Sequence, residues 1–439
     1  MKNLVRLPAF YLCLVLFAVV LVLFEDRQEH SWDVNRLSGT SFRLPKIQSI
    51  IIYNKSKVHA PHTSENASRT QPHSEPLTTL TQTTKEAQQG EVSGGEAQLL
   101  PMKTILVWTY GYGGKTMGFG EGQAPFKTAG CEVDSCYLTK NKTMVPLDAF
   151  DATLFHFRSL KADNLPNKRS PHQRWVFWEM ESASYVYQDP GTYNHLFNWT
   201  MTYRWDSDVQ QRYGRVIPIP PSTSSTTSST SPSASPPPGG LERNYAKGKT
   251  KMAAWFVSNC FTISRREKLV RYLKKHIQVD IYGKCGKLSC PREKTEECYD
   301  MLGQHYKFYL SFENSLCKDY VTEKLFSVLR HDVVPVVLGG SNYTSITPPH
   351  SIINVKDFPS ITALINHLKY LDGNDTAYNE YFWWKKQYQV VDGWRGGAQG
   401  FCDLCKKLHE DQTPKVYSDI RDWFVGQGEC LRLNLRVAS

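Results

Sequence analysis

The feature that most constrains the fold is a regular alternation of apolar, strand-like runs with helical segments after residue 250. The strand-like runs lie at 253–258, 279–283, 306–312, 333–339 and 351–355. Uninterrupted apolar strands separated by helices are typical of a parallel sheet that is covered by helices on both faces. The sequence therefore predicts an α/β fold for this half of the chain.

The helical segments carry start signals and apolar faces. Ser264 and Glu267 have the spacing of a capping box, which predicts a helix whose first residue is Arg265. A second helix is expected to start near Tyr320, and a third to cover 361–371. The second helix would place one apolar stripe toward the sheet, formed by Val321, Leu325, Val328 and Leu329.

The first half of the chain shows a similar but less regular pattern, with strand-like runs at 105–111, 153–157 and 174–180. A segment rich in Pro, Ser and Thr follows at 218–240 and contains nothing that could pack into a core. We therefore expect a linker at 218–240 between two domains, which cover 102–217 and 241–439.

The N-terminal region predicts a membrane anchor. Residues 7–24 are uncharged and apolar, and as a helix rising ~1.5 Å per residue they would approach the ~30 Å of a bilayer core. Lys2 and Arg6 precede this run, which favours a cytoplasmic tail at 1–6 and a lumenal remainder. A cleaved signal peptide is the alternative, but the run exceeds a usual signal-peptide core and lacks a small-residue cleavage site. Residues 25–101, polar and poor in aromatics, are expected to form a disordered lumenal stem.

The cysteines and glycosylation sequons agree with a lumenal location. Of eleven cysteines, Cys13 lies in the apolar run, which leaves an even number outside it. These favour disulfides over zinc, because the one C-x-x-C pair, Cys402 and Cys405, has no second pair to complete a zinc site. The sequons all follow the apolar run, at Asn54, Asn66, Asn141, Asn198, Asn342 and Asn374.

The net charge of +10 raises the question of a nucleic-acid partner. A lumenal domain rarely meets nucleic acid, and the basic residues are dispersed without an RNA-binding motif. The charge therefore predicts no nucleic-acid partner but remains compatible with an anionic small ligand.

Two cations follow two of the predicted parallel strands, where ligands bind in open α/β sheets. Arg265 stands at one helix start, with the adjacent Arg266 an equal candidate, and Lys324 stands near another beside Glu323. Solvated surface charges are the simpler interpretation of each one. Together, two cations at helix starts indicate a diphosphate group, such as that of a nucleotide sugar.

Three other patterns in the sequence are typical of functional sites. The run 109–116 ends in Gly-Lys-Thr like a phosphate loop, but Thr109 stands where such a loop needs glycine, so a glycine-rich turn is favoured. Asp206 and Asp208 resemble a metal-binding Asp-x-Asp pair, yet they lie before the linker, away from the proposed phosphate site, which favours turn or cap roles. Glu179 and Glu181 lie at or beyond the end of an aromatic strand, where apolar surroundings can raise a carboxyl pKa and suit a general base, although the sequence alone favours a pair of surface acids at a strand end.

The sequence FYLSFENSLCKDYVTEKLF, followed by VVPVVLGGSNY, resembles the signature of the α1,3-fucosyltransferases of glycosyltransferase family 10. The resemblance extends over 102–439 and includes WEMESASYV, TYRWDSDVQQRYG and the C-terminal FCDLCKKL. The linker is longer than the usual connection, and Ala183 stands where the family commonly has proline after Glu-Ser. The stretch SLCKDY around Cys317 resembles core-type or invertebrate members more than Lewis-type members, which favours an N-glycan acceptor.

The resemblance implies a GT-B fold of two Rossmann-like domains and inverting transfer of L-fucose from GDP-β-L-fucose to O3 of N-acetylglucosamine. It implies a Golgi type II membrane enzyme held by 7–24, acting on N-glycans or other glycoprotein glycans, with no required cofactor and no indicated metal. It implies that Glu181 is the catalytic base, and that the donor is held by Arg265, Asn314, Tyr320, Glu323 and Lys324. A Golgi sulfotransferase, suggested by Gly-Lys-Thr, and a non-catalytic lectin-like protein are the alternatives.

Overall fold

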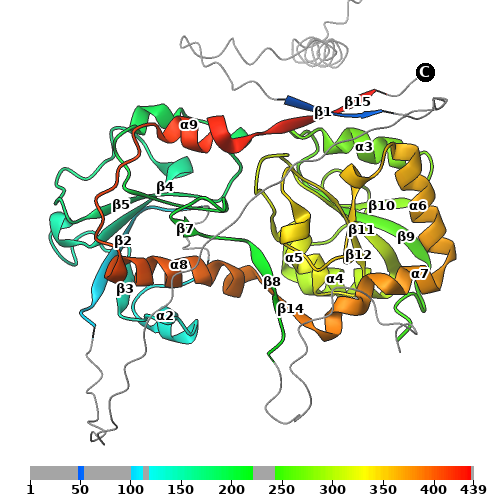
Figure 1. The fold of residues 1–439 in the computed structure, drawn as a ribbon, viewed down its shortest axis with the longest axis horizontal. Coiled ribbons are helices and arrows are strands. Elements are labelled where there is room, and N and C mark those ends of the chain that lie inside the picture. Colours follow the sequence, from blue (N-terminus) through cyan, green and yellow to red (C-terminus); the bar gives the residue numbers. More distant parts are fainter. Residues whose placement is uncertain (1–47, 54–99, 112–117, 221–242, 437–439) are drawn as a thin grey trace, which may run out of the picture. The chain divides into compact units, whose positions relative to one another are not determined.

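The computed structural model describes residues 48–53, 100–111, 118–220 and 243–436 (Figure 1). The predicted tail and anchor, most of the stem, and 221–240 of the linker lie outside these residues. Within the described residues, no helix combines the length and apolarity needed to cross a bilayer.

A sheet of six parallel strands organises the first half of the chain. Its order is β3-β2-β4-β5-β6-β7, with bounds Cys136–Thr139, Lys103–Thr109, Ala152–His156, Arg174–Glu179, Trp199–Thr202 and Val209–Gln210. Every residue of β4 and β5 is buried, which explains why these strands read as continuous apolar runs. We call this sheet and the elements packed on it the first lobe.

A second parallel sheet organises the other half, and we call it with its helices the second lobe. Its order is β10-β9-β11-β12-β13, with bounds Val279–Tyr282, Lys251–Phe256, Tyr306–Phe312, Val334–Leu338 and Ile353–Asn354. Helices follow these strands at α3 (Arg266–Leu273), α4 (Thr295–His305), α5 (Glu323–Leu329), α6 (Ile361–Gly373) and α7 (Asp375–Asn379). The predicted α/β class and the parallel pairing are confirmed.

The end of the chain returns to the first lobe. Helix α8 (Gly393–Glu410) places Phe401, Leu404 and Leu408 in the core of the first sheet, along which it runs in Figure 1. Helix α9 (Ile420–Phe424) also packs there, through Ile420 and Phe424. Residues expected to belong to one domain from 241 to 439 therefore contribute to both lobes.

The two lobes are joined by short strands as well as by the chain between them. Strand β8 (Gly214–Pro218) pairs antiparallel with β14 (Tyr388–Asp392), so the outgoing and returning segments lie side by side (Figure 1). Gly214 is required at this crossing, because an added Cβ would lie 2.4 Å from the ring of Phe326. Strand β1 (Gln48–Tyr53), within the expected disordered stem, pairs with β15 (Leu431–Arg436).

Two predicted helix starts are wrong by one to three residues. Helix α3 begins at Arg266, because Arg265 adopts a left-handed conformation with φ of 59° at the cap position. The predicted capping box does not form, and the Glu267 carboxylate instead accepts from Thr262. Helix α5 begins at Glu323, since the side chain of Thr322 caps it by accepting from the Lys324 N–H.

The cysteines of the described residues form disulfides, as predicted, and three of these bonds connect parts of the chain that are distant in sequence. Two of them attach α8 to the first lobe, and one attaches the loop before α5 to the C-terminal segment. Cys402 and Cys405 both take part, so neither thiolate is available to hold zinc. The bonded pairs are Cys131–Cys402, Cys136–Cys405, Cys260–Cys285, Cys290–Cys298 and Cys317–Cys430.

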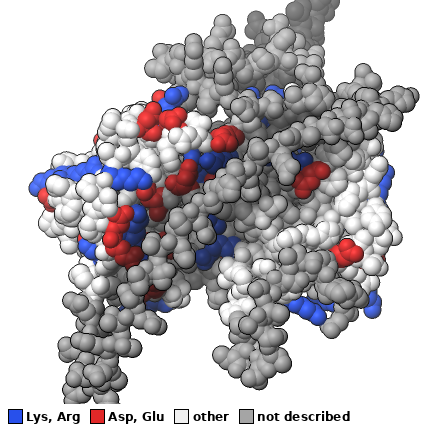
Figure 2. Space-filling view, viewed as in Figure 1, with Lys and Arg blue, Asp and Glu red and all other residues white. Residues whose placement is uncertain are grey.

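Charge is intermixed on the face drawn in Figure 2. Basic and acidic side chains of the described residues lie close together over the first lobe. Opposite charges at this spacing largely cancel at the distance of a polyanion. This face therefore offers no extended basic surface within the part of the chain that the structure describes.

Candidate active site

The junction between β11 and α5 surrounds Lys324 with oxygen atoms. Its ammonium nitrogen lies 3.3 Å from Glu313 Oε2, 3.1 Å from Glu323 Oε1 and 2.8 Å from Thr322 Oγ1. The Glu313 carboxylate is buried and accepts the Thr322 N–H at 2.8 Å and its hydroxyl at 2.9 Å. Lys324 is therefore fixed in direction by a buried acid and by the helix cap.

These carboxylates also keep Lys324 charged. Burial acts to lower the pKa of Lys324, but the Glu313 and Glu323 carboxylates outweigh it and raise the pKa above its ordinary value. The site consequently presents a permanent ammonium near the N-terminus of α5. A cation of this kind suits the oxygens of a diphosphate.

The second predicted cation, Arg265, lies beside the same junction. The Ser264 hydroxyl donates to the Glu313 carbonyl at 2.9 Å, and the Ser264 N–H donates to the Asn314 carbonyl at 3.1 Å. Arg265 is half-buried, and within the described residues its side chain forms no ion pair. The alternative cation, Arg266, is buried and donates to the Phe312 carbonyl, so it stabilises the second lobe.

Asn314 is the third predicted donor residue at this junction. Its Oδ1 is buried and has no hydrogen-bond partner within the described residues. A buried amide oxygen without a partner costs free energy unless a ligand or water donates to it. This oxygen is therefore available to a hydroxyl or N–H of a bound molecule.

The remaining two predicted donor residues differ in accessibility. Glu323 is exposed, with 51% of its side chain accessible, and can reach a ligand directly. Tyr320 is only 2% exposed and packs between Tyr203 and Tyr213, with ring centroids 5.0 Å and 6.4 Å away. Tyr320 can therefore contact a ligand only through an edge of its side chain, and its main contacts join the two lobes.

In the first lobe, Glu179 and Glu181 have different surroundings. Glu179 is buried, and its carboxylate accepts the N–H groups of Arg158, Met180 and Glu181 at 3.0, 2.9 and 2.8 Å. Burial outweighs these hydrogen bonds and raises the pKa of Glu179 to about 7. Glu181 is one-third exposed, and its carboxylate lies 3.3 Å from an Arg158 nitrogen.

Hydroxyl groups bring Glu181 close to the second lobe. Its neighbour Ser182 donates to Ser315 at 2.6 Å, and Ser184 donates to Ser315 at 2.7 Å. Ser315 follows Asn314 directly. Glu181 of the first lobe and Asn314 of the second lobe therefore each lie one residue from the same contact between the lobes.

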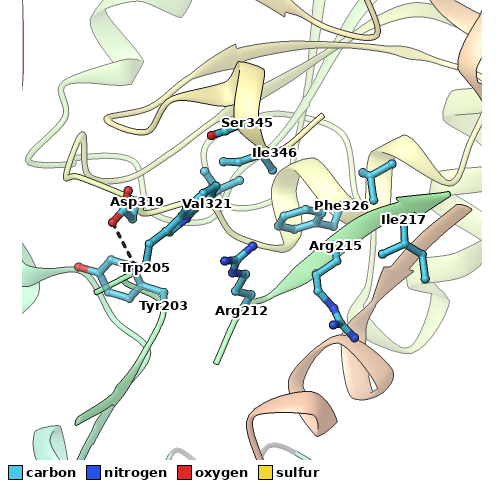
Figure 3. Close-up of a pocket in the computed structure, with 12 residues that line it drawn as sticks. Tyr203, Trp205, Arg212, Arg215, Ile217, Asp319, Val321, Phe326, Ser345 and Ile346 are labelled. Carbon is cyan, nitrogen blue, oxygen red and sulfur yellow. Dashed lines mark hydrogen bonds between the residues drawn. The ribbon is translucent and has the colours of Figure 1, made fainter. Parts of the chain in front are cut away.

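A cavity of about 200 Å³ adjoins this region (Figure 3). It lies between Tyr203 and Trp205 of the first lobe and Asp319, Val321 and Phe326 of the second. In Figure 3 the Arg212 guanidinium points toward Val321, whereas Arg215 points away from the cavity. Neither Glu181 nor Lys324 lines this cavity, so it lies beside the predicted residues and does not contain them.

The aspartates of the Asp-x-Asp pair have structural roles. Asp206 forms a two-nitrogen ion pair with Arg204, and Asp208 accepts from Thr200 and Tyr417. Asp206 lies in a turn, as predicted, whereas the contacts of Asp208 tie it to β6 and to Tyr417. The Gly-Lys-Thr residues of the run 109–116 lie outside the described residues.

Family models match both lobes of the chain. Residues 100–214 match the model "Fucosyltransferase, N-terminal", and 246–423 match "Glycosyltransferase family 10 (fucosyltransferase) C-term". The chain belongs to glycosyltransferase family 10. This fucosyltransferase is 38% identical to α-(1,3)-fucosyltransferase C of Drosophila melanogaster over 75% of its own length and 79% of the relative.

Other known proteins resemble this fucosyltransferase in the same region. α-(1,3)-Fucosyltransferase 7 of Rattus norvegicus is 33% identical, covering 76% of this chain and 82% of the relative. A solved α1,3-fucosyltransferase structure with GDP-fucose is 17% identical, covers 75% of this chain and 96% of that chain, and has a TM-score of 0.44.

Sequence reasoning missed three residues of this fucosyltransferase that position the predicted ones. Glu313 was assigned no role from the sequence, although its carboxylate contacts Lys324. Thr322 was missed as a helix cap, and its position directly before Glu323 was the available signal. Arg158 follows a different strand from Glu181, and no local pattern links the two residues.

Proposed function

We propose that this chain is an inverting α1,3-fucosyltransferase that transfers L-fucose from GDP-β-L-fucose to O3 of N-acetylglucosamine in glycoprotein glycans. The observation that carries the proposal is the contact between the loop that holds Glu181 and the loop before α5, where Ser182 and Ser184 donate to Ser315, the neighbour of Asn314. The names of its relatives and of the similar solved structure support the donor and the linkage.

The second lobe would hold the donor. Lys324 and Arg265 would bind the diphosphate, Asn314 Oδ1 would accept from a hydroxyl, and Glu323 would orient ribose or fucose hydroxyls. Tyr320 would contribute at most an edge contact. As the bond between fucose C1 and the phosphate oxygen breaks, its electron pair leaves with GDP, and the two cations stabilise that charge.

The first lobe would activate the acceptor. Glu181 would take the proton from O3 of N-acetylglucosamine while that oxygen attacks fucose C1 from the side opposite GDP. One displacement of this kind inverts the configuration at C1 and needs no covalent intermediate. Arg158 would hold the Glu181 carboxylate in position through the 3.3 Å contact.

The arrangement of two parallel α/β lobes around this site supports the GT-B type with two Rossmann-like domains. We further propose a Golgi type II membrane enzyme that is anchored by 7–24 and has a lumenal catalytic part. The disulfides fit an oxidising compartment. The stretch around Cys317 favours the N-acetylglucosamine of the N-glycan core as the acceptor. N-acetyllactosamine is the alternative acceptor.

The test is to incubate the protein with GDP-fucose and a panel of core N-glycans and N-acetyllactosamine glycans. We expect a fucose linked α1,3 to N-acetylglucosamine in at least one product, identified by mass spectrometry and NMR. A folded protein that transfers no fucose to any acceptor would overturn the proposal. Family membership leaves the sulfotransferase alternative without support, and measurable turnover would remove the lectin-like one.

A further inference from the structure

Tyr187 is a large aromatic side chain that the fold leaves uncovered next to the proposed base. It lies in the loop after β5, the same loop that carries Glu181, and 71% of the residue is exposed. The other aromatics of this stretch are used in packing. Trp178 is fully buried, and Tyr185 is half-buried and accepts a hydrogen bond from Asn259 of the second lobe.

Arg158 connects this exposed ring to the base. One guanidinium nitrogen lies 3.3 Å from Glu181 Oε1, and the guanidinium carbon lies 4.5 Å from the centroid of the Tyr187 ring. The arginine is itself largely buried, with 16% of its side chain exposed. The ring and the carboxylate are therefore separated by the width of one guanidinium group and held by the same side chain.

The chemistry of the uncovered ring face indicates a sugar. Arg158 covers one face, and the high exposure leaves the other to solvent. The π face of an aromatic ring carries partial negative charge, so it attracts the weakly positive C–H groups on the face of a neutral pyranose. Binding sites for small polar ligands commonly combine such a ring with a few placed polar groups, here Glu181 and Arg158.

We propose that Tyr187 forms an acceptor subsite, where its ring stacks on the neutral sugar next to the N-acetylglucosamine that receives fucose. The proposal rests on the proposed function, because it takes Glu181 as the point where the acceptor hydroxyl binds. It adds that the enzyme selects oligosaccharides over monosaccharides. The binding free energy of the second sugar would come from its contact with Tyr187 on the first lobe, away from the donor.

The experiment compares two acceptor lengths in the full-length protein and three variants. The acceptors are the methyl glycoside of N-acetylglucosamine and a disaccharide, either N,N′-diacetylchitobiose or N-acetyllactosamine. The ratio of kcat/KM for disaccharide over monosaccharide is measured at saturating GDP-fucose. Tyr187→Ala removes the ring, Tyr187→Phe keeps it, and Tyr370→Ala removes an exposed tyrosine from the outer helix α6 as the matched control.

We expect Tyr187→Ala to lower the disaccharide preference about fivefold through a higher acceptor KM, with the KM for GDP-fucose unchanged. Tyr187→Phe and Tyr370→Ala should keep the preference of the parent. An unchanged ratio in Tyr187→Ala, or an equal loss in Tyr370→Ala, would overturn the subsite while leaving the proposed function intact. A parent enzyme that transfers no fucose to either acceptor would instead defeat the proposed function.

Discussion

Each lobe carries a buried carboxylate and a more accessible one after a central strand, but the buried acids have different partners. After β5, buried Glu179 accepts backbone N–H groups, and Glu181, one-third exposed, contacts Arg158. After β11, buried Glu313 contacts the Lys324 ammonium and the Thr322 cap, and exposed Glu323 contacts the same ammonium.

The difference shows that the partner decides what a buried acid does. Burial raises the pKa of Glu179 to about 7, since backbone donors only partly offset desolvation, so this acid is half-protonated near neutrality. Burial also raises the pKa of Glu313, against the opposing effect of Lys324, which retains its charge. The first lobe uses its buried acid to shape a loop, and the second uses its buried acid to hold a cation.

The largest expected effect separates the two lobes by function. Glu181→Gln should lower kcat about 100-fold or more, because it removes the proton acceptor, while GDP-fucose affinity is retained. Lys324→Ala should mainly weaken GDP-fucose binding, since it removes a diphosphate contact. Steady-state kinetics with donor titrations measure both. An equal loss of donor affinity in the two variants would contradict this division between the lobes.

The next effect tests Glu313 as the residue that positions Lys324. Glu313→Gln should lower GDP-fucose affinity about tenfold and the free energy of unfolding by about 2 kcal/mol, because the ammonium loses its buried partner. Glu323→Gln, at the exposed partner of the same ammonium, should change the free energy of unfolding by less than about 1 kcal/mol. Isothermal titration with GDP and urea unfolding measure the two quantities. Equal unfolding curves for these variants would argue against a special role for the buried acid.

Glu179, the buried acid of the first lobe, should make the free energy of unfolding depend on pH. Its pKa is about 7 in the folded protein against an ordinary value of 4.5, so the protonated form favours folding. Its contribution to stability is complete below about pH 4.5 and is lost as the pH rises through about 7. Glu179→Gln should remove this loss, so that its free energy of unfolding gains about 3 kcal/mol on the parent between pH 4.5 and pH 8. Parallel curves for the two proteins would show that Glu179 ionises normally.

The smallest expected effect concerns metal ions. Asp206 and Asp208 are engaged by protein groups, and in the proposed function Arg265 and Lys324 supply the positive charge for the diphosphate. Fucose transfer should therefore persist in the presence of EDTA at nearly the parent rate. A loss of transfer that added Mn²⁺ restores would show that the two cations do not suffice.

Much of the second lobe could be predicted because its signals are local. The apolar runs that became β9, β11 and β12, and the helical face of Leu269, are fixed by side-chain periodicity along a few residues. The starts of α3 and α5 could not be predicted from the same pattern. They depend on the left-handed backbone of Arg265 and on the capping side chain of Thr322. The loops before both helices are held by hydrogen bonds to Glu313, one from Ser264 and one from Thr322.

The candidate site was likewise predictable where its signals are local and unpredictable where it depends on contacts between distant segments. Motifs indicated which residues matter, but burial excluded Arg266 and nearly covered Tyr320, and neither outcome appears in local spacing. Glu313 contacts its partner across the turn before α5, and Arg158 reaches Glu181 from another strand. Side-chain contacts of this kind arise only when separate strands are packed into one sheet.

The sequence by itself determined the α/β class, the two sheets and the presence of disulfides. The alternation of apolar strands and helices is set over short stretches, and the even number of cysteines after the apolar run favours disulfides. The tertiary structure decided that α8 returns to the first lobe, which acid is buried, and that Arg266 is buried while Arg265 stays half-buried. Those outcomes depend on the exclusion of water at contacts between distant segments, and no local pattern encodes that burial.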